Sequence, residues 1–167
     1  ELRAKINQFF KHIHENGVYG DLFRQYYAEV ERFDYVDMKV YHRRLATRLP
    51  KYQPILMAAA REFDFDWRLI AAQMYQESHF RRYARSHAGA YGLMQLTKRT
   101  AKSFGVTDIT DPEQNIYAGV QHLRNLFDYY DIQNESDRQS IALAAYNIGQ
   151  GHVRDAQKLA ILLRMDP

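Results

Sequence analysis

Cysteine is absent from this chain of 167 residues, which excludes disulfide bonds, thiol nucleophiles and thiolate metal sites within it. No apolar run approaches the roughly 20 residues that a membrane-spanning helix needs. No segment alternates between apolar and polar residues with the period of two typical of strands, and no Asn-Gly or Asp-Gly hairpin signal occurs. These absences, with a hydrophobic content of 46% that suffices for a core, predict an all-α domain.

The charges are nearly balanced, with 23 Lys and Arg against 20 Asp and Glu and a formal net charge of +3. The basic residues are scattered among acids, so nucleic acid is not implied as a partner, although weak attraction to an anionic polymer is allowed. His12 and His14 point in two directions on a helix, and no His-Glu-x-x-His segment occurs. We therefore expect neither a metal site nor another cofactor.

Apolar residues recur at helical spacing along most of the chain, and several helix ends carry capping signals. Asp66 is an expected N-cap, and Asp111, which precedes a proline, is a strong start signal. Asp37 and either Ser136 or Asp137 are the next expected caps. The predicted helices cover residues 1–16, 21–31, 37–49, 51–63, 66–77, 97–104, 112–130, 136–148 and 152–164.

Glu77 occupies an unusual helical position for a carboxylate. At about 100° per residue it falls almost in line with Ile70 and Met74, on the flank of the buried stripe. It also lies near the helix C-terminus, where the helix dipole disfavours negative charge. Partial burial and the dipole should both raise its pKa, which suits a general acid near neutral pH. The alternative is a surface glutamate at a fraying helix end.

A glycine- and alanine-rich turn at residues 88–92 (AGAYG) follows Glu77 and leads into residues 93–96 (LMQL). Glycine lets the backbone turn sharply and approach a ligand closely, so this loop could fold back beside the carboxyl and wall a cleft. Ser78 and His79 come directly after Glu77. Adjacency in sequence does not make a catalytic triad, so we do not expect a serine nucleophile.

Several separated blocks between residues 50 and 155 form a recognisable series. In chain order they are Glu77-Ser78, Ser86, Gly89-Ala90, residues 92–96, Ala145-Tyr146-Asn147 and Gly149. Together they resemble the signature of soluble-lytic-transglycosylase-type domains. The resemblance implies an all-α, goose-type lysozyme-like fold, here with a short N-terminal helical extension.

The same resemblance implies an enzyme that cleaves the β-1,4 bond between N-acetylmuramic acid and N-acetylglucosamine in peptidoglycan. Such enzymes leave a 1,6-anhydromuramoyl end without consuming water. Glu77 is then implied to be the catalytic acid. The residues implied to hold the sugars and their acetamido groups are Ser86, Met94, Gln95, Tyr146 and Asn147. Without the resemblance, Met94 reads as a core residue, Ser86 as a loop serine, and Tyr146 with Asn147 as a buried hydrogen-bonded pair.

A single carboxyl suits this chemistry if the substrate's own N-acetyl group stabilises C1, whereas ordinary glycosidases need two carboxylates. No acid in the matched blocks partners Glu77, and the aspartates Asp64, Asp66, Asp108 and Asp111 are better explained as caps and turn residues. The alternatives are a lysozyme-like hydrolase and a peptidoglycan-binding or regulatory module without turnover. A helical nucleic-acid binder is suggested only by a pI near 9.1 and 13 tyrosines.

Residues 33–37 and 67–69 most resemble a membrane-bound branch of the family, in which the catalytic domain follows a periplasmic solute-binding-protein-like domain. We therefore expect residues 1–32 to be the helical tail of such an upstream regulatory domain, or a linker. Residues 33–167 are expected to form the catalytic domain, shortened at its C-terminus. The implied location is the periplasm, with attachment to the outer membrane in the full-length protein.

Overall fold

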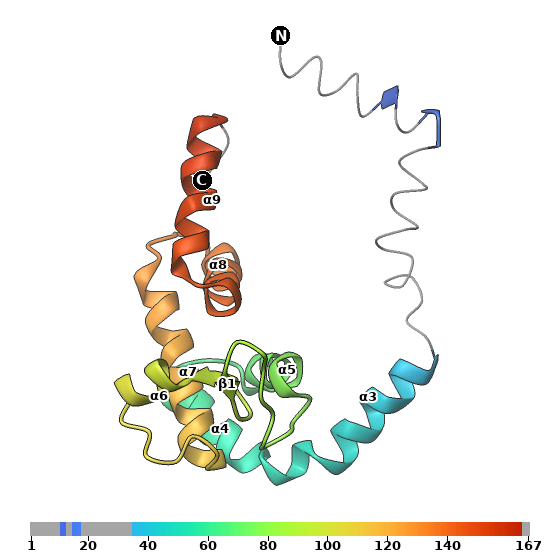
Figure 1. The fold of residues 1–167 in the computed structure, drawn as a ribbon, viewed down its shortest axis with the longest axis vertical. Coiled ribbons are helices and arrows are strands. Elements are labelled where there is room, and N and C mark those ends of the chain that lie inside the picture. Colours follow the sequence, from blue (N-terminus) through green and yellow to red (C-terminus); the bar gives the residue numbers. More distant parts are fainter. Residues whose placement is uncertain (1–10, 13–14, 18–34, 165–167) are drawn as a thin grey trace. The chain divides into compact units, whose positions relative to one another are not determined.

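The computed structural model describes residues 11–12, 15–17 and 35–164 (Figure 1). The chain divides into two compact units, Glu1–Leu45 and Ala46–Pro167. In the first unit, residues 11, 12 and 15 are helical, and Gly17 has a positive φ of 80° where the sequence predicts a helix to stop. The helix predicted at residues 21–31 lies outside the described residues. The assignment of residues 1–32 to an upstream domain therefore stays a prediction.

Helices dominate the described residues, as the sequence predicts. Helix α3 spans Tyr35–Thr47, and the short 3-10 helix η1 spans Leu49–Lys51 and contains Pro50. The other elements, all in the second unit, are α4 (Gln53–Glu62), α5 (Trp67–Ser78), β1 (Ala90–Tyr91), β2 (Leu96–Thr97), α6 (Lys98–Ser103), α7 (Pro112–Tyr129), α8 (Glu135–Ile148) and α9 (Gln150–Leu162).

Two predicted caps are confirmed with their hydrogen bonds. The Asp66 carboxylate accepts from the Arg68 backbone N–H at 2.8 Å and starts α5. The Asp111 carboxylate accepts from the Gln114 backbone N–H at 2.9 Å and starts α7, with Pro112 in its first turn. Each bond satisfies one of the N–H groups that a helix start leaves unpaired, which stabilises the helix by about 1 kcal/mol.

Three other boundary predictions are wrong. Helix α8 is capped by Asn134, whose side-chain oxygen accepts from the backbone N–H groups of Ser136 and Asp137 at 2.9 and 3.3 Å. The two residues expected to act as caps instead donate the backbone N–H groups that Asn134 caps. Asp37 lies inside α3 and does not start it. Helix α9 begins at Gln150, so it starts before residue 152 and includes Gly151.

A small antiparallel ladder interrupts the helices after α5, where no strand was expected. Ala90 pairs with Thr97 and Tyr91 with Leu96, and Arg85 forms an isolated bridge with Tyr91. Each strand is two residues long, which is too short for apolar and polar residues to alternate in a detectable way. The ladder closes the glycine-rich segment into a compact loop.

Helix α7 lies at the centre of the second unit and packs against α4 and α8. Its inner side chains Ile116, Val120 and Leu123 are at most 1% exposed. The core also contains equally buried residues of other elements, among them Leu56 of α4, Ile70 and Met74 of α5, and Leu93, Met94 and Leu96 of the loop and β2. Among the described residues no helix combines the length and the apolar character that crossing a membrane requires.

Candidate active site

Glu77 lies in the last turn of α5, and its side chain is half-buried. Burial raises the pKa of its carboxyl from 4.5 to about 7. No described cation or hydrogen-bond donor offsets that effect, and no described carboxylate adds to it. Near neutral pH the group therefore exists in both the acid and the carboxylate form, as a group that first gives and then takes a proton must.

The end of α5 is shaped by two consecutive left-handed residues, His79 and Phe80, with φ of 51° and 59°. The His79 N–H donates to the Tyr75 carbonyl at 2.7 Å and closes the helix. Ser78 is 1% exposed, and its hydroxyl donates to the Met74 carbonyl at 3.1 Å. Ser78 therefore belongs to the helix core, which agrees with the expectation that it is no nucleophile.

Ser86 closes the glycine-rich loop. Its hydroxyl oxygen accepts from the Ala90 backbone N–H at 3.0 Å, and its own N–H donates to the Ala90 carbonyl at 3.0 Å. Gly89 and Gly92 have φ of 79° and 82°, a region that other residues adopt only with strain. The Gly92 N–H donates to the Ala84 carbonyl at 2.9 Å, so the loop folds back on its own beginning. The hydroxyl hydrogen of Ser86 remains available to a ligand.

The Asn115 side chain links this loop to α7 through hydrogen bonds. Sequence analysis did not identify this residue. It is 1% exposed, and its side-chain oxygen accepts from the Met94 N–H at 2.8 Å. Its side-chain nitrogen donates to the carbonyls of Tyr91 and Ile109, at 3.2 and 2.8 Å. A side chain at Gly92 would place its Cβ 2.3 Å from that nitrogen, so only glycine fits there.

Gly119, one turn after Asn115, makes room for Met94. A Cβ at Gly119 would come within 2.6 Å of the Met94 Cβ. A glycine in the middle of a helix costs about 1 kcal/mol relative to alanine. Its presence on the apolar face of α7 was therefore the sequence signal that another residue packs closely there. Asn115 and Gly119 together position the loop against the helix.

Met94 and Gln95 make contacts that stabilise the loop itself. Met94 is 0% exposed as a whole residue, and its N–H and carbonyl are both hydrogen-bonded, to Asn115 and Tyr146. The Gln95 amide nitrogen donates to the carbonyls of Ala84 and Gly92, at 3.2 and 3.0 Å, and its backbone has a φ of 49°. Of the two predicted sugar contacts, Gln95 keeps its amide oxygen for a ligand, while Met94 serves the core.

Tyr146 of α8 connects the loop with the carboxyl of Glu77. Its hydroxyl donates to the Met94 carbonyl at 2.8 Å, across 52 residues of sequence. Burial, and then the negative charge of nearby Glu77, raise the pKa of the Tyr146 phenol well above its usual value. The phenol therefore stays neutral and remains a donor. Asn147 is exposed, so it forms no buried pair with Tyr146.

His122 of α7 is a further residue that sequence reasoning missed. Its ring lies 5.2 Å from the Tyr146 ring and 5.9 Å from the Phe104 ring, measured between centroids. Burial lowers the pKa of its imidazole, so His122 is neutral at pH 7 and supports the Tyr146 ring without adding charge. Within the described part of the chain, no group of three or more His, Asp or Glu side chains is arranged to hold a metal ion.

The structure thus brings Glu77, Tyr146 and the 92–95 loop together. Residues 54–161 match the family described as Transglycosylase SLT domain. The chain is 53% identical, over 99% of its length, to membrane-bound lytic murein transglycosylase F of Desulfosudis oleivorans. It is 43% identical, again over 99%, to the protein of the same name from Vibrio cholerae. It spans 37% and 31% of those two relatives, about a third of each.

A solved structure agrees with this match. The chain is similar to an inactive glutamate-to-glutamine mutant of lytic transglycosylase Slt from Pseudomonas aeruginosa, with 32% identity and a TM-score of 0.54. The similarity covers 66% of this chain and 19% of the Slt chain. The sequence prediction of an all-α, lysozyme-like domain is therefore confirmed. Because the family match covers more than half of its residues, the chain belongs to the Transglycosylase SLT domain family.

Proposed function

We propose that this chain is the catalytic domain of a peptidoglycan lytic transglycosylase. It would cleave the β-1,4 bond between N-acetylmuramic acid and N-acetylglucosamine and leave a 1,6-anhydromuramoyl end. The observation that carries the proposal is the half-buried Glu77 carboxyl, with a pKa of about 7 and Tyr146 beside it. Two further facts support it: the relatives are named lytic murein transglycosylases, and the Slt structure is that of an inactive glutamate-to-glutamine mutant.

Glu77 would act twice. In its acid form it gives a proton to the glycosidic oxygen as the bond to C1 breaks. As carboxylate it then takes the proton of the muramoyl 6-hydroxyl, whose oxygen attacks C1. No described carboxylate affects the Glu77 pKa, so stabilisation of C1 falls to the substrate's own N-acetyl group, as in substrate-assisted glycosidases.

The proposed sugar-binding residues are those whose side chains keep a hydrogen-bonding group that the protein does not use. Ser86 has a free hydroxyl hydrogen, Gln95 an amide oxygen, and Asn147 an exposed amide. Tyr146 would act through its ring and by holding the Met94 carbonyl, and with it the loop, in place. We therefore assign the acetamido and hydroxyl contacts to Ser86, Gln95 and Asn147. Met94 is fully buried and would support the loop without touching the sugar.

The larger protein would place this domain in the periplasm, attached to a membrane. The relatives are called membrane-bound, and this chain corresponds to 31–37% of their length. An upstream solute-binding-protein-like domain that regulates the groove would account for part of the remainder. Peptidoglycan glycan strands would be the substrate.

Digestion of purified sacculi in water enriched in ¹⁸O tests the reaction directly. A lytic transglycosylase releases anhydro ends that contain no ¹⁸O, whereas a hydrolase releases reducing ends that carry it. Mass spectrometry of the soluble fragments distinguishes the two. Full activity of a Glu77→Gln variant would contradict the assignment of the acid.

A second outcome separates turnover from binding. If this chain and the full-length protein both bind sacculi but release no fragments, the domain is a binding or regulatory module. The Glu77→Gln variant is the control, because it keeps the shape of the groove and lacks a proton to give.

A further inference from the structure

The backbone is strained directly after Glu77. His79 and Phe80 follow it with φ of 51° and 59°, in the left-handed region. That region costs free energy for every residue with a side chain, and such strain persists only where neighbouring contacts hold it. The contacts that hold these two residues therefore also fix the end of α5, on which Glu77 lies.

Some of these contacts are local. Arg81 donates to the Ser78 carbonyl through its backbone N–H and through Nε, each at 3.1 Å. The Tyr75 ring lies 4.9 Å from the His79 ring and 5.4 Å from the Phe80 ring, measured between centroids. These partners all belong to one short stretch of chain. They would move together if the last turn of α5 opened.

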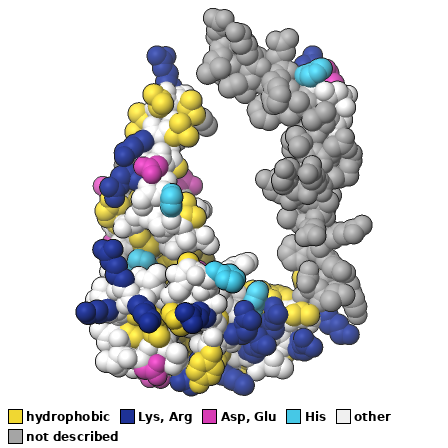
Figure 2. All heavy atoms as spheres, viewed as in Figure 1, with side chains coloured by type: hydrophobic (Ala, Val, Ile, Leu, Met, Phe, Trp, Pro, Cys, Tyr) yellow, Lys and Arg dark blue, Asp and Glu magenta, His cyan; other side chains and the backbone are white. Residues whose placement is uncertain are grey.

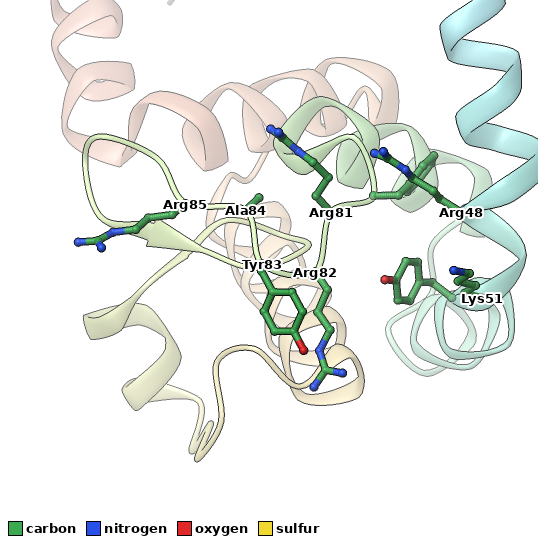
Figure 3. A pocket seen from close by; sticks show the side chains of 9 residues that line it. Arg48, Lys51, Arg81, Arg82, Tyr83, Ala84 and Arg85 are labelled. Carbon is green, nitrogen blue, oxygen red and sulfur yellow. The ribbon is translucent and has the colours of Figure 1, made fainter.

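Arg48 supplies a contact from a distant part of the sequence. Its Nη1 donates to the His79 carbonyl at 2.9 Å, across 31 residues. Arg48 is half-buried and begins η1, where its own carbonyl accepts from the Lys51 N–H at 3.2 Å. Helix η1 packs against α4, and α4 packs against α5. Figure 3 shows the Arg48 and Arg81 side chains, which come from these two separate segments. Arg48 therefore ties the end of α5 to another part of the core.

The effect of Arg48 on Glu77 is geometric. Lys and Arg side chains are numerous on the face drawn in Figure 2, so positive charge alone does not distinguish Arg48. Burial raises the pKa of the Glu77 carboxyl, and no described cation contributes to that shift. If the last turn of α5 opened, water would reach the carboxyl and its pKa would fall toward 4.5.

We propose that Arg48 is a positioning residue for the reaction, which keeps the end of α5 closed and Glu77 sheltered by holding the His79 carbonyl. The inference rests on the proposed function. Arg48 precedes residues 54–161, the segment that matches the family. The working catalytic unit would therefore include a residue outside that segment. The alternative is that the bond stabilises the fold and does nothing else.

Arg48→Gln removes the guanidinium, and Arg138→Gln is the matched control. Arg138 is also partly buried, and it donates through Nε to a backbone carbonyl, that of Phe127, at 2.7 Å. It lines a cavity together with Asp66, the N-cap of α5. That end of α5 lies roughly 16 Å along the helix from Glu77. Both variants should lose thermal stability, so a loss of stability alone would not distinguish them.

The first measurement needs no turnover. The ¹³C chemical shift of the Glu77 δ-carbon is titrated by NMR between pH 4 and 9, and a Glu77→Gln sample identifies the signal. We expect a pKa of about 7 in the unaltered protein and in Arg138→Gln. Arg48→Gln should lower this pKa by about one unit, and Arg48→Lys, which keeps a single ammonium donor, by about half a unit.

Turnover of peptidoglycan gives the second measurement. At pH 5, where Glu77 is mostly protonated in every variant, Arg48→Gln should lower kcat about tenfold and change KM less than about twofold. The alkaline limb of its pH profile should move to lower pH by the same interval as the NMR pKa.

An unchanged pKa in Arg48→Gln, or an equal shift in Arg138→Gln, would overturn the proposal. If Arg48→Gln does not fold, Arg48→Lys decides by the same criteria. If the unaltered chain cleaves no peptidoglycan, the proposed function fails, while the titration still decides whether Arg48 controls the shelter of Glu77.

Discussion

The hydroxyl of Tyr146 donates a 2.8 Å hydrogen bond to the carbonyl of Met94, and so joins helix α8 to the loop after Glu77. The opposite side of the same residue is held by Asn115, which accepts from the Met94 N–H at 2.8 Å. Met94 is therefore fixed by one bond on each side of its peptide backbone. The wall of the candidate groove owes its position to these two contacts.

Replacement of Tyr146 by Phe removes one contact and leaves the ring. The Met94 carbonyl then loses its partner, which should lower the free energy of unfolding by about 1–2 kcal/mol. The pKa of Glu77 should change little, because its elevation comes from burial. We expect a reduced kcat with an unchanged alkaline limb in the pH profile. A large shift of that limb would mean that the phenol acts on Glu77 directly.

Activity should depend on pH through Glu77. Its carboxyl must be protonated to start the reaction, and its pKa is about 7. Under subsaturating substrate, the rate should therefore be nearly constant well below pH 7 and should fall about tenfold per unit well above it. Initial rates of fragment release between pH 5 and 9 measure this. A decline centred near the ordinary carboxyl value of 4.5 would contradict the burial of Glu77.

Stability gives an independent measure of the same pKa. The folded-state pKa of Glu77 lies above the unfolded value, so the native state holds more protons between pH 4.5 and 7. Stability is fully retained below the lower value and is lost as pH rises through the higher one. Glu77→Gln should therefore match the parent at pH 4 and exceed its free energy of unfolding by about 2 kcal/mol at pH 8. Urea unfolding at the two pH values tests it, and equal differences at both would refute it.

Two glycine replacements should have opposite effects. Gly119→Ala places a methyl group 2.6 Å from the Met94 Cβ, so it should destabilise the fold by about 1–3 kcal/mol despite the better helix propensity of alanine. Gly151→Ala in α9 is the matched control, because nothing lies within 4 Å of the added carbon. It should stabilise by up to about 1 kcal/mol. Thermal unfolding of both variants decides the point, and equal stabilisation would show that the loop yields to the methyl group.

Asn115→Ala should be among the most damaging single changes. It leaves the Met94 N–H and the carbonyls of Tyr91 and Ile109 without their partner in a buried site. We expect a loss of about 2–4 kcal/mol and a KM that rises as the loop becomes mobile. Asn125→Ala is the control on the same helix, since Asn125 is exposed and should tolerate the change within about 0.5 kcal/mol.

Local signals predicted the helices and one property of the candidate site, the partial burial of Glu77. Asp66 and Asp111 cap their helices within three residues along the chain, so their role is visible in the sequence. The burial of Glu77 follows from helical phase alone. Asn134 was missed because three residues of capping type fall within four positions, and only the geometry decides among them.

The role of Asn115 depends on distant partners. The Met94 N–H comes from 21 residues away and the Tyr91 carbonyl from 24, so no local pattern could reveal the contact. The two-residue strands escaped notice because their pairing is set by the loop and leaves no alternation. The order of the sequence blocks indicated the family, whereas the burial of Met94 could be seen only in the structure.

Asn115 and Gly119 contact the loop from successive turns of one helix, the first through hydrogen bonds and the second through close packing. One residue inserted between them would rotate Gly119 by about 100° around the axis and turn it away from Met94. The number of residues between these two positions of α7 therefore cannot change without losing one of the two contacts. The connection between α7 and α8 has no such restriction, and lengthening it carries only a small entropic cost. We therefore expect this domain to tolerate insertions in that connection and not in the turns of α7 that contact the loop.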